Sequence, residues 1–76
     1  MPLCFVMINA ELGSEKSLVE KIRKIEGVIE VNEVYGVYDI VVQIESNSMG
    51  RLKDTISRNI RSLNGVRSTL TMVVIT

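Results

Sequence analysis

The apolar positions of this chain switch between a two-residue and a 3.6-residue period, and the switches divide the chain into successive strands and helices. Residues Leu3–Ala10 form a nearly continuous apolar run. Because apolar residues occupy both parities, the pattern predicts a strand that is covered on both faces. We expect the domain's own helices to cover one face and a partner subunit to cover the other.

A helical pattern follows the break at Gly13-Ser14. Ser14 is the expected N-cap, and Gly27 is placed to end the helix with a positive φ. The apolar side chains fall within an arc of about 120° on a helical wheel, which predicts an amphipathic helix of about eleven residues. These side chains are Leu18, Val19, Ile22 and Ile25.

Two alternating segments come next. Residues 28–35 and 38–45 each follow the two-residue period of a strand, and Gly36-Val37 lies between them. The pattern predicts an antiparallel hairpin with a turn centred on Gly36-Val37. In the second strand, one face is uniformly apolar and comprises Tyr38, Ile40, Val42 and Ile44.

A second helix is predicted from Met49 to Ser62, after a polar break that offers two N-cap serines. Its apolar residues keep within an arc of about 80°. Gly65 ends this helix as Gly27 ends the first, and residues 66–76 form a last strand rich in Val, Ile, Thr and Met. We interpret the basic residues of this helix as a solvated surface, because they do not share one face: Arg51, Lys53, Arg58 and Arg61.

The order β-α-β-β-α-β predicts an α+β fold of the ferredoxin-like type, with a four-stranded antiparallel sheet and both helices on one face. Gly27-Val28 is echoed by Gly65-Val66, which is 65 − 27 = 38 positions later in a chain of 76 residues. We therefore expect one domain over residues 1–76, built from two similar halves. The sheet face without helices is too apolar to remain exposed to water, so we predict that two sheets pack face to face in a dimer.

Size and composition favour the same dimer. A chain of 8.5 kDa buries only about 60% of its surface on folding. Yet 46% of the residues are hydrophobic, which is more than a small monomer can easily hide. Association with further copies is the simplest remedy.

The amino-acid composition excludes several classes of function. The net charge is zero, so the chain lacks the basic footprint of a nucleic-acid-binding protein. It contains no His, which removes His-activated nucleophiles and imidazole metal sites. No segment has the length of a membrane span or the pattern of a signal peptide. We therefore expect a cytoplasmic protein that is not an enzyme and that needs no cofactor, metal, nucleic acid or membrane.

Three polar features remain as candidates. Cys4 lies in the first strand, where we expect a small core residue. Asp39 begins a strand directly after the glycine turn, where its carboxylate either accepts backbone N–H groups or receives the ammonium group of a ligand. The hydroxyls of Ser68, Thr69 and Thr71 lie on the last strand, where threonine is a good strand former and where hydroxyls also suit a carboxylate ligand.

The chain resembles the C-terminal effector module of the Lrp/AsnC feast/famine transcription regulators. The resemblance rests on Gly27-Val28, on the glycine turn followed by Tyr38-Asp39 at the head of a strand, on Gly65-Val66, and on the Ser-Thr-x-Thr strand at 68–71. It covers essentially the whole chain. The helix-turn-helix of the full-length regulators has no counterpart here, so the resemblance implies a stand-alone effector module without DNA binding.

The resemblance implies a ferredoxin-like fold, sheet-mediated homodimers and a higher assembly such as a ring of four dimers. It also implies an amino-acid effector bound between dimers, and co-assembly with full-length Lrp/AsnC regulators. Carried onto this sequence, the implied ligand-binding residues are Tyr35, Gly36, Val37, Tyr38, Asp39, Thr69 and Thr71.

Two alternatives stay open. A dimeric α+β barrel enzyme uses a related architecture, although the missing His and the sparse polar groups on the inner face count against it. The other is a purely structural or ACT-like regulatory domain. A cavity with two or more convergent ionisable groups would favour the enzyme. A closed, ligand-free dimer interface with no cleft near Gly36 would favour the structural domain.

Overall fold

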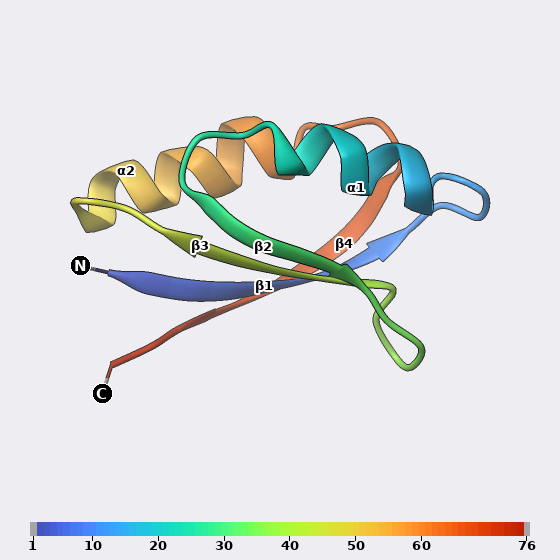
Figure 1. Ribbon diagram of the computed structural model, residues 1–76, viewed down its shortest axis with the longest axis horizontal. Coiled ribbons are helices and arrows are strands. Elements are labelled where there is room, and N and C mark those ends of the chain that lie inside the picture. Colours follow the sequence, from blue (N-terminus) through green and yellow to red (C-terminus); the bar gives the residue numbers. More distant parts are fainter. Residues whose placement is uncertain (1, 76) are drawn as a thin grey trace.

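A computed structural model describes residues 2–75 as a four-stranded sheet with a layer of helices on one face (Figure 1). All three neighbouring strand pairs are antiparallel, in the order β2-β3-β1-β4. The ferredoxin-like prediction is therefore confirmed. In chain order the elements are β1 (Leu3–Ala10), α1 (Glu15–Arg23), β2 (Val28–Glu33), β3 (Ile40–Glu45), α2 (Met49–Asp54), the π-helical segment η1 (Thr55–Ile60) and β4 (Val66–Val73).

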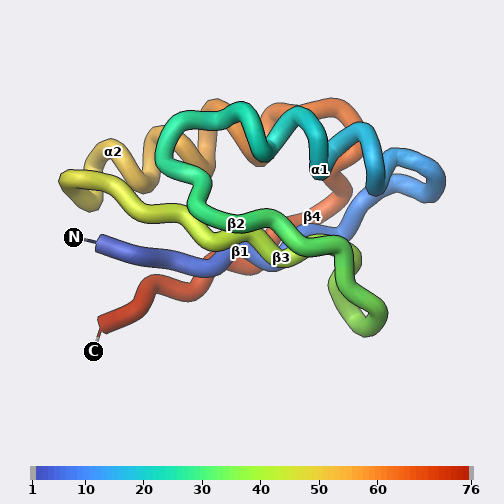
Figure 2. Tube along the Cα trace, in the orientation of Figure 1, coloured from blue at the N-terminus to red at the C-terminus, as the bar shows by residue number. Residues whose placement is uncertain are grey.

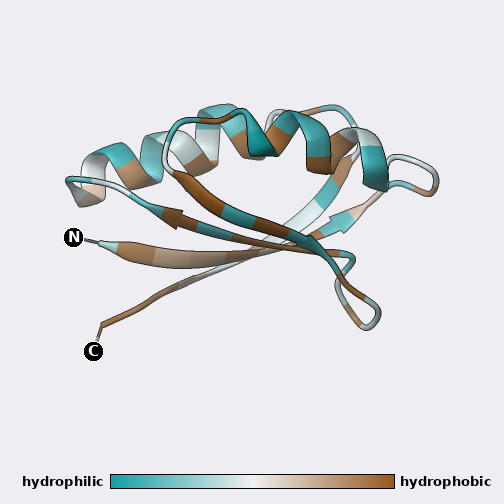
Figure 3. Ribbon diagram, viewed as in Figure 1, coloured by the Kyte–Doolittle hydropathy of each residue, from teal (hydrophilic) through white to brown (hydrophobic). Residues whose placement is uncertain are grey.

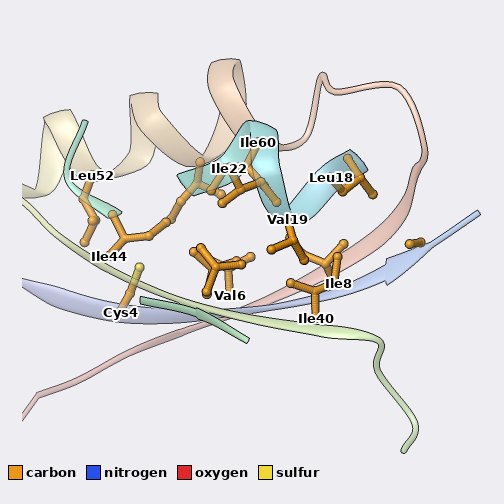
Figure 4. Close-up of a cluster of buried hydrophobic side chains, with 14 residues drawn as sticks. Cys4, Val6, Ile8, Leu18, Val19, Ile22, Ile40, Ile44, Leu52 and Ile60 are labelled. Atoms are coloured by element: carbon orange, nitrogen blue, oxygen red, sulfur yellow. The ribbon is translucent and has the colours of Figure 1, made fainter. Parts of the chain in front are cut away.

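The core lies between the helices and the two central strands, β1 and β3 (Figure 4). Along β1, fully buried side chains alternate with half-buried ones, because only one parity meets the helices. The fully buried residues of both strands are Cys4, Val6, Ile8, Ile40, Val42 and Ile44, and they pack under Leu18, Ile22, Leu52 and Ile60.

Cys4 is one of these core residues, as expected from its position in the first strand. Desolvation by burial raises the pKa of its thiol above the ordinary value of 9.0. A neutral, buried thiol is a poor nucleophile. Cys4 therefore packs as a small apolar side chain.

Gly27 and Gly65 have the predicted positive φ, of +96° and +99°, but neither ends its helix directly. The helix α1 ends at Arg23 with Lys24 as its C-cap, and η1 ends at Ile60 with Arg61 as its C-cap, so each glycine lies in the turn that leads into the next strand. Each also lies against neighbouring atoms. A Cβ added to Gly65 would stand 2.8 Å from the Cβ of Ser14, at the start of α1. Ser14 occupies the N-cap position but its side chain makes no capping hydrogen bond, whereas Ser48 caps α2 by accepting the N–H of Arg51 at 3.2 Å.

The second helix departs from the uniform helix predicted for Met49–Ser62. It is α-helical to Asp54 and π-helical from Thr55 to Ile60, where Arg61 N–H donates to the carbonyl of Ile56. Leu52, Ile56 and Ile60 are spaced by four residues, which exceeds the 3.6-residue turn of an α-helix. The wider π turn offsets this drift and keeps all three residues buried.

The β2–β3 connection is wider than the predicted turn. The strands end at Glu33 and resume at Ile40, and Val34 N–H donates to the Asp39 carbonyl at 2.8 Å across the base of the loop. We call residues 34–39 the hairpin loop. Tyr35 and Tyr38 thus lie outside the strands, and Gly36 does not have the positive φ that a tight glycine turn requires. The last strand, β4, is shorter than the predicted strand over 66–76 and ends at Val73, and Thr76 lies outside the described residues.

Candidate functional site

The hairpin loop leaves the sheet on the side away from the helices (Figure 2). Tyr35 and Val37 at its tip are almost fully exposed, at 108% and 85%. A Cβ added to Gly36 would meet nothing within 4 Å, and its φ is one that other residues adopt. Nothing within the protomer therefore requires a glycine at position 36.

Asp39 ties the hairpin loop to the end of β1. Its Oδ2 accepts the N–H of Ala10 at 2.8 Å, and its own N–H donates to the carbonyl of Ile8 at 2.9 Å. The hydrogen bond from Ala10 N–H is the structural role expected for this carboxylate, which is to accept a backbone N–H group. It uses one carboxylate oxygen, so Asp39 can accept a further donor through the other.

Cross-strand register places two further polar side chains beside Asp39 on the open face of the sheet. Ile8 pairs with Ile40, so the next residue of β1, Asn9, lies next to Asp39. Asn9 also pairs with Ser68 of β4, and its Nδ2 donates to Ser68 Oγ at 3.1 Å. We call Asp39, Asn9 and Ser68 the polar row. Our sequence-based site missed Asn9 and left out Ser68, although the alternation of the last strand separates Ser68 from its threonine neighbours.

The two predicted threonines lie on the opposite face. Thr69 pairs with Ile8 and Thr71 with Val6, and both partners are buried beneath the helices. Directly paired residues in an antiparallel sheet project to the same side. The structure therefore separates Thr69 and Thr71 from the hairpin loop, and of the seven predicted residues only Tyr35–Asp39 form one continuous segment.

In the hydropathy colouring of Figure 3, β1 is hydrophobic along most of its length, whereas β2 alternates between hydrophobic and hydrophilic residues. The cross-strand register divides the open face into two unlike halves. Following the register, β2 and β3 contribute a polar half: Glu30, Asn32, Gln43 and Glu45, with Val41 among them. The strands β1 and β4, with the residue directly after β4, contribute an apolar half: Leu3, Phe5, Met7, Leu70, Met72 and Val74. Leu70 and Met72 remain 45% and 44% exposed in the protomer.

Two grooves flank the second helix on its two sides. The larger, of about 550 Å³, is lined by charges of both signs, among them Glu26, Glu45, Arg51 and Arg58. The smaller, of about 270 Å³, lies between the second helix and β4, and we call it the β4 groove. Its lining includes Lys53 and Arg61. The basic residues that we interpreted as a solvated surface are thus divided into two pairs.

Neither groove is lined by the hairpin loop, and Thr71 is the one predicted site residue that lines either of them. A ligand at the loop would therefore need a second subunit to enclose it. Within residues 2–75, no three acidic or cysteine side chains gather as metal ligands, and no helix is long and apolar enough to span a membrane.

A four-stranded antiparallel sheet with helices on one face, in the order β-α-β-β-α-β, defines the ferredoxin-like class of α+β domains. The particular family follows from sequence: residues 3–76 match the model of the Lrp/AsnC ligand binding domain, and the chain belongs to this family. The described residues are fully occupied by the ferredoxin-like elements, so they contain no helix-turn-helix.

Two curated relatives place the same module in different contexts. The HTH-type transcriptional regulator FL11 of Pyrococcus furiosus is 32% identical over 73 residues, which are 96% of this chain and 48% of FL11. A homocitrate synthase of Sulfolobus acidocaldarius is 42% identical over 59 residues, which are 78% of this chain and 12% of the synthase. The chain therefore spans less than half of either relative.

Solved structures agree with this assignment. FFRP-DM1 superposes with a TM-score of 0.95 at 31% identity, over 99% of this chain and 100% of that one. A Neisseria meningitidis transcriptional regulator in complex with L-Met has a TM-score of 0.89, over 99% of this chain and 50% of that one. At 16% identity, the second likeness extends to the fold alone.

Proposed function

We propose that this chain is an effector-sensing assembly module that dimerises through its open sheet face and binds an amino acid at the hairpin loop. The module is not itself an enzyme and acts in the cytoplasm by changing the assembly of a regulator. The observation that carries the proposal is the combination of a glycine that the protomer does not require with an adjacent carboxylate that has an oxygen to spare.

The apolar half of the open face supports the dimer. Its six side chains lie on two neighbouring strands and carry no charge. Exposed apolar patches rimmed by polar residues are typical of subunit interfaces. A twofold axis over β1 and β4 would bury this half against its copy and leave the polar half at the margin.

The open space above Gly36 supports the proposal that a ligand binds at the hairpin loop. Glycine without a conformational or steric requirement is expected where another group approaches the backbone closely. The ammonium group of an amino acid would meet Asp39, and the backbone N–H groups of the loop would meet its carboxylate. The L-Met bound by the Neisseria regulator is an effector of this chemical class. Tyr35 and Val37 would contact a neighbouring dimer, as a ring of four dimers requires.

Native mass spectrometry with a panel of the twenty amino acids tests this proposal. We expect a dimer without ligand and a larger assembly with at least one amino acid, because a ligand that bridges subunits stabilises the assembly that forms its site. An unchanged mass distribution and no bound ligand across the panel would remove the effector function and leave the fold assignment intact.

Gly36→Val is the variant that tests the site. The added side chain enters open space, so folding should be unaffected while ligand-driven assembly is lost. Gly50→Ala is the matched control, because a Cβ at Gly50 also meets nothing within 4 Å but lies on α2, away from the loop.

A second candidate function is regulation of a metabolic enzyme, favoured by the 42% identity to part of homocitrate synthase. Here the module would associate with an enzyme carrying a similar domain, whereas the first reading pairs it with a full-length regulator such as FL11. Mixing the chain with each purified relative and measuring the masses of the complexes distinguishes these two functions. Mixed oligomers with the synthase alone would favour the enzyme partner.

A further inference from the structure

The β4 groove has an apolar floor and a cationic rim. Leu52 and Ile56 of the second helix form the floor, and each is at least 90% buried. Met49 and Val73 form apolar walls that are both 41% exposed. The volume of about 270 Å³ corresponds to roughly nine water molecules. This size suits a small ligand with a short aliphatic chain.

The charges around the groove have one sign. Lys53 and Arg61 line it, and no acidic residue does. The larger groove on the other side of the helix differs in this respect, because Glu26, Glu45 and Asp54 balance its arginines. An anion therefore gains attraction in the β4 groove without facing a carboxylate, whereas the ammonium group of an amino acid would meet two cations and no acceptor of opposite charge.

Further hydrogen-bond donors line the groove or lie at the edge of the sheet beside it. The hydroxyls of Ser57 and Thr71 line the groove. Val74 N–H donates to the Leu3 carbonyl, so residues of that parity bond to β1 and the N–H groups of Thr71 and Val73 point to the opposite side of β4. No strand lies there, because β4 is an edge of the sheet.

From these features we propose that the β4 groove binds a small aliphatic monocarboxylate without an amino group. The chain of the ligand lies over Leu52 and Ile56, and its carboxylate lies between Lys53 and Arg61 with a hydroxyl donor from Ser57 or Thr71. The groove opens on the helix side of the sheet and stays accessible when the open face is covered by a second copy. It is a different site from the hairpin loop and does not depend on the function proposed there.

Titration of the ¹⁵N-labelled chain with 4-methylpentanoate tests the site. We expect saturable shifts of the amide signals of Ser57, Arg61 and Thr71. The neutral analogue 4-methylpentanamide should bind at least about tenfold more weakly, because it loses a charge-assisted hydrogen bond. Leucine should not perturb these signals, because its ammonium group is repelled.

Lys53→Gln and Arg61→Gln should each raise the dissociation constant at least about fivefold, and the double variant should remove saturation. Both residues are exposed, so the variants should fold. Arg51→Gln is the matched control, because it removes the same charge from the same helix but lines the other groove. The proposal is overturned if the acid and the amide bind equally, if the double variant binds like the original chain, or if no shift appears at millimolar acid. Shifts confined to the hairpin loop would also overturn it, while supporting the other site.

Discussion

The two faces of the sheet bury apolar side chains by different means. On the helix side, the apolar residues of β1 and β3 are fully buried within the protomer by α1, α2 and η1. On the open side, the apolar residues of β1 and β4 are half-buried or exposed, and no element within residues 2–75 covers them. The first face forms the core of the protomer, whereas the second is the surface of the dimer that we propose. In that dimer, the nearly continuous apolar run of β1 would make two different contacts, one with the helices and one with the second copy.

The strand β4 shows this difference most clearly. Its more apolar parity, with Leu70 and Met72 and continued by Val74 just beyond the strand, faces away from the helices, whereas Thr69 and Thr71 face toward them. In an isolated domain the apolar parity would turn to the core. The reverse arrangement is what a second sheet over the open face would require. Four predictions, taken from the largest expected effect to the smallest, test the comparison between the faces.

Replacing a core residue should have the largest effect. Ile40→Ala should lower the free energy of unfolding by about 2–5 kcal/mol, since it leaves a cavity under the helices. Val41→Ala, on the other face of the same strand, should cost less than half as much. Urea unfolding measures both. Should Ile40→Ala fail to fold, Ile40→Val provides the milder test at about 0.5–1.5 kcal/mol. Equal losses of unfolding free energy at positions 40 and 41 would contradict the conclusion that the core lies on the helix side of the sheet alone.

A charge in the apolar half of the open face should dissociate the dimer without unfolding the protomer. Phe5→Glu should raise the dimer dissociation constant at least about 100-fold, because an unpaired carboxylate would be buried at the interface. Asn32→Glu, in the polar half, should change it less than about tenfold. Analytical ultracentrifugation gives both constants, and circular dichroism checks the fold. If both variants dissociate alike, the apolar half is not the centre of the interface.

Two glycines allow a similar comparison, because Gly65 packs against the start of α1 whereas Gly36 lies in the exposed hairpin loop. Gly65→Ala should destabilise the fold by about 2 kcal/mol, from a left-handed φ and a close contact with Ser14. Gly36→Ala should leave the stability unchanged or raise it by about 0.4–1 kcal/mol, since alanine restricts the unfolded chain. Thermal unfolding of both variants measures the difference. Destabilisation by Gly36→Ala would mean that the protomer, rather than a ligand, requires this glycine.

The smallest effect is the pH dependence contributed by Cys4. Burial raises the pKa of its thiol in the folded state above 9.0, so the unfolded chain releases this proton first as the pH rises. The contribution to stability is complete below pH 9.0 and decreases as the pH rises through that value toward the folded pKa. Cys4→Val removes the titrating group at similar size. Its unfolding free energy should therefore fall less between pH 8 and pH 10 than that of the original chain, and parallel curves would contradict this.

Much of the fold could be predicted because its signals are local. The periods that define β1, α1 and β3 depend on residues within one element, and the positive φ of Gly27 and Gly65, directly before β2 and β4, is a property of their own backbone. The family resemblance selected the hairpin loop as the implied site. Two local features were not predicted. The π-helical turn of η1 depends on how Leu52, Ile56 and Ile60 meet the sheet, and the wide hairpin loop depends on where Asp39 bonds to β1.

The sequence by itself determined the order of strands and helices, because hydrophobic period and glycine positions act over a few residues. Only the tertiary structure decided which residues of different strands and helices lie together on one face. Ser68 joins Asp39 and Asn9, while Thr71 joins Lys53 and Arg61, because the pairing of β4 with β1 sets the side to which each residue projects. That register is a contact between the two ends of the chain. No local pattern encodes it, and it divides the predicted site into a hairpin loop on one side and a cationic groove on the other.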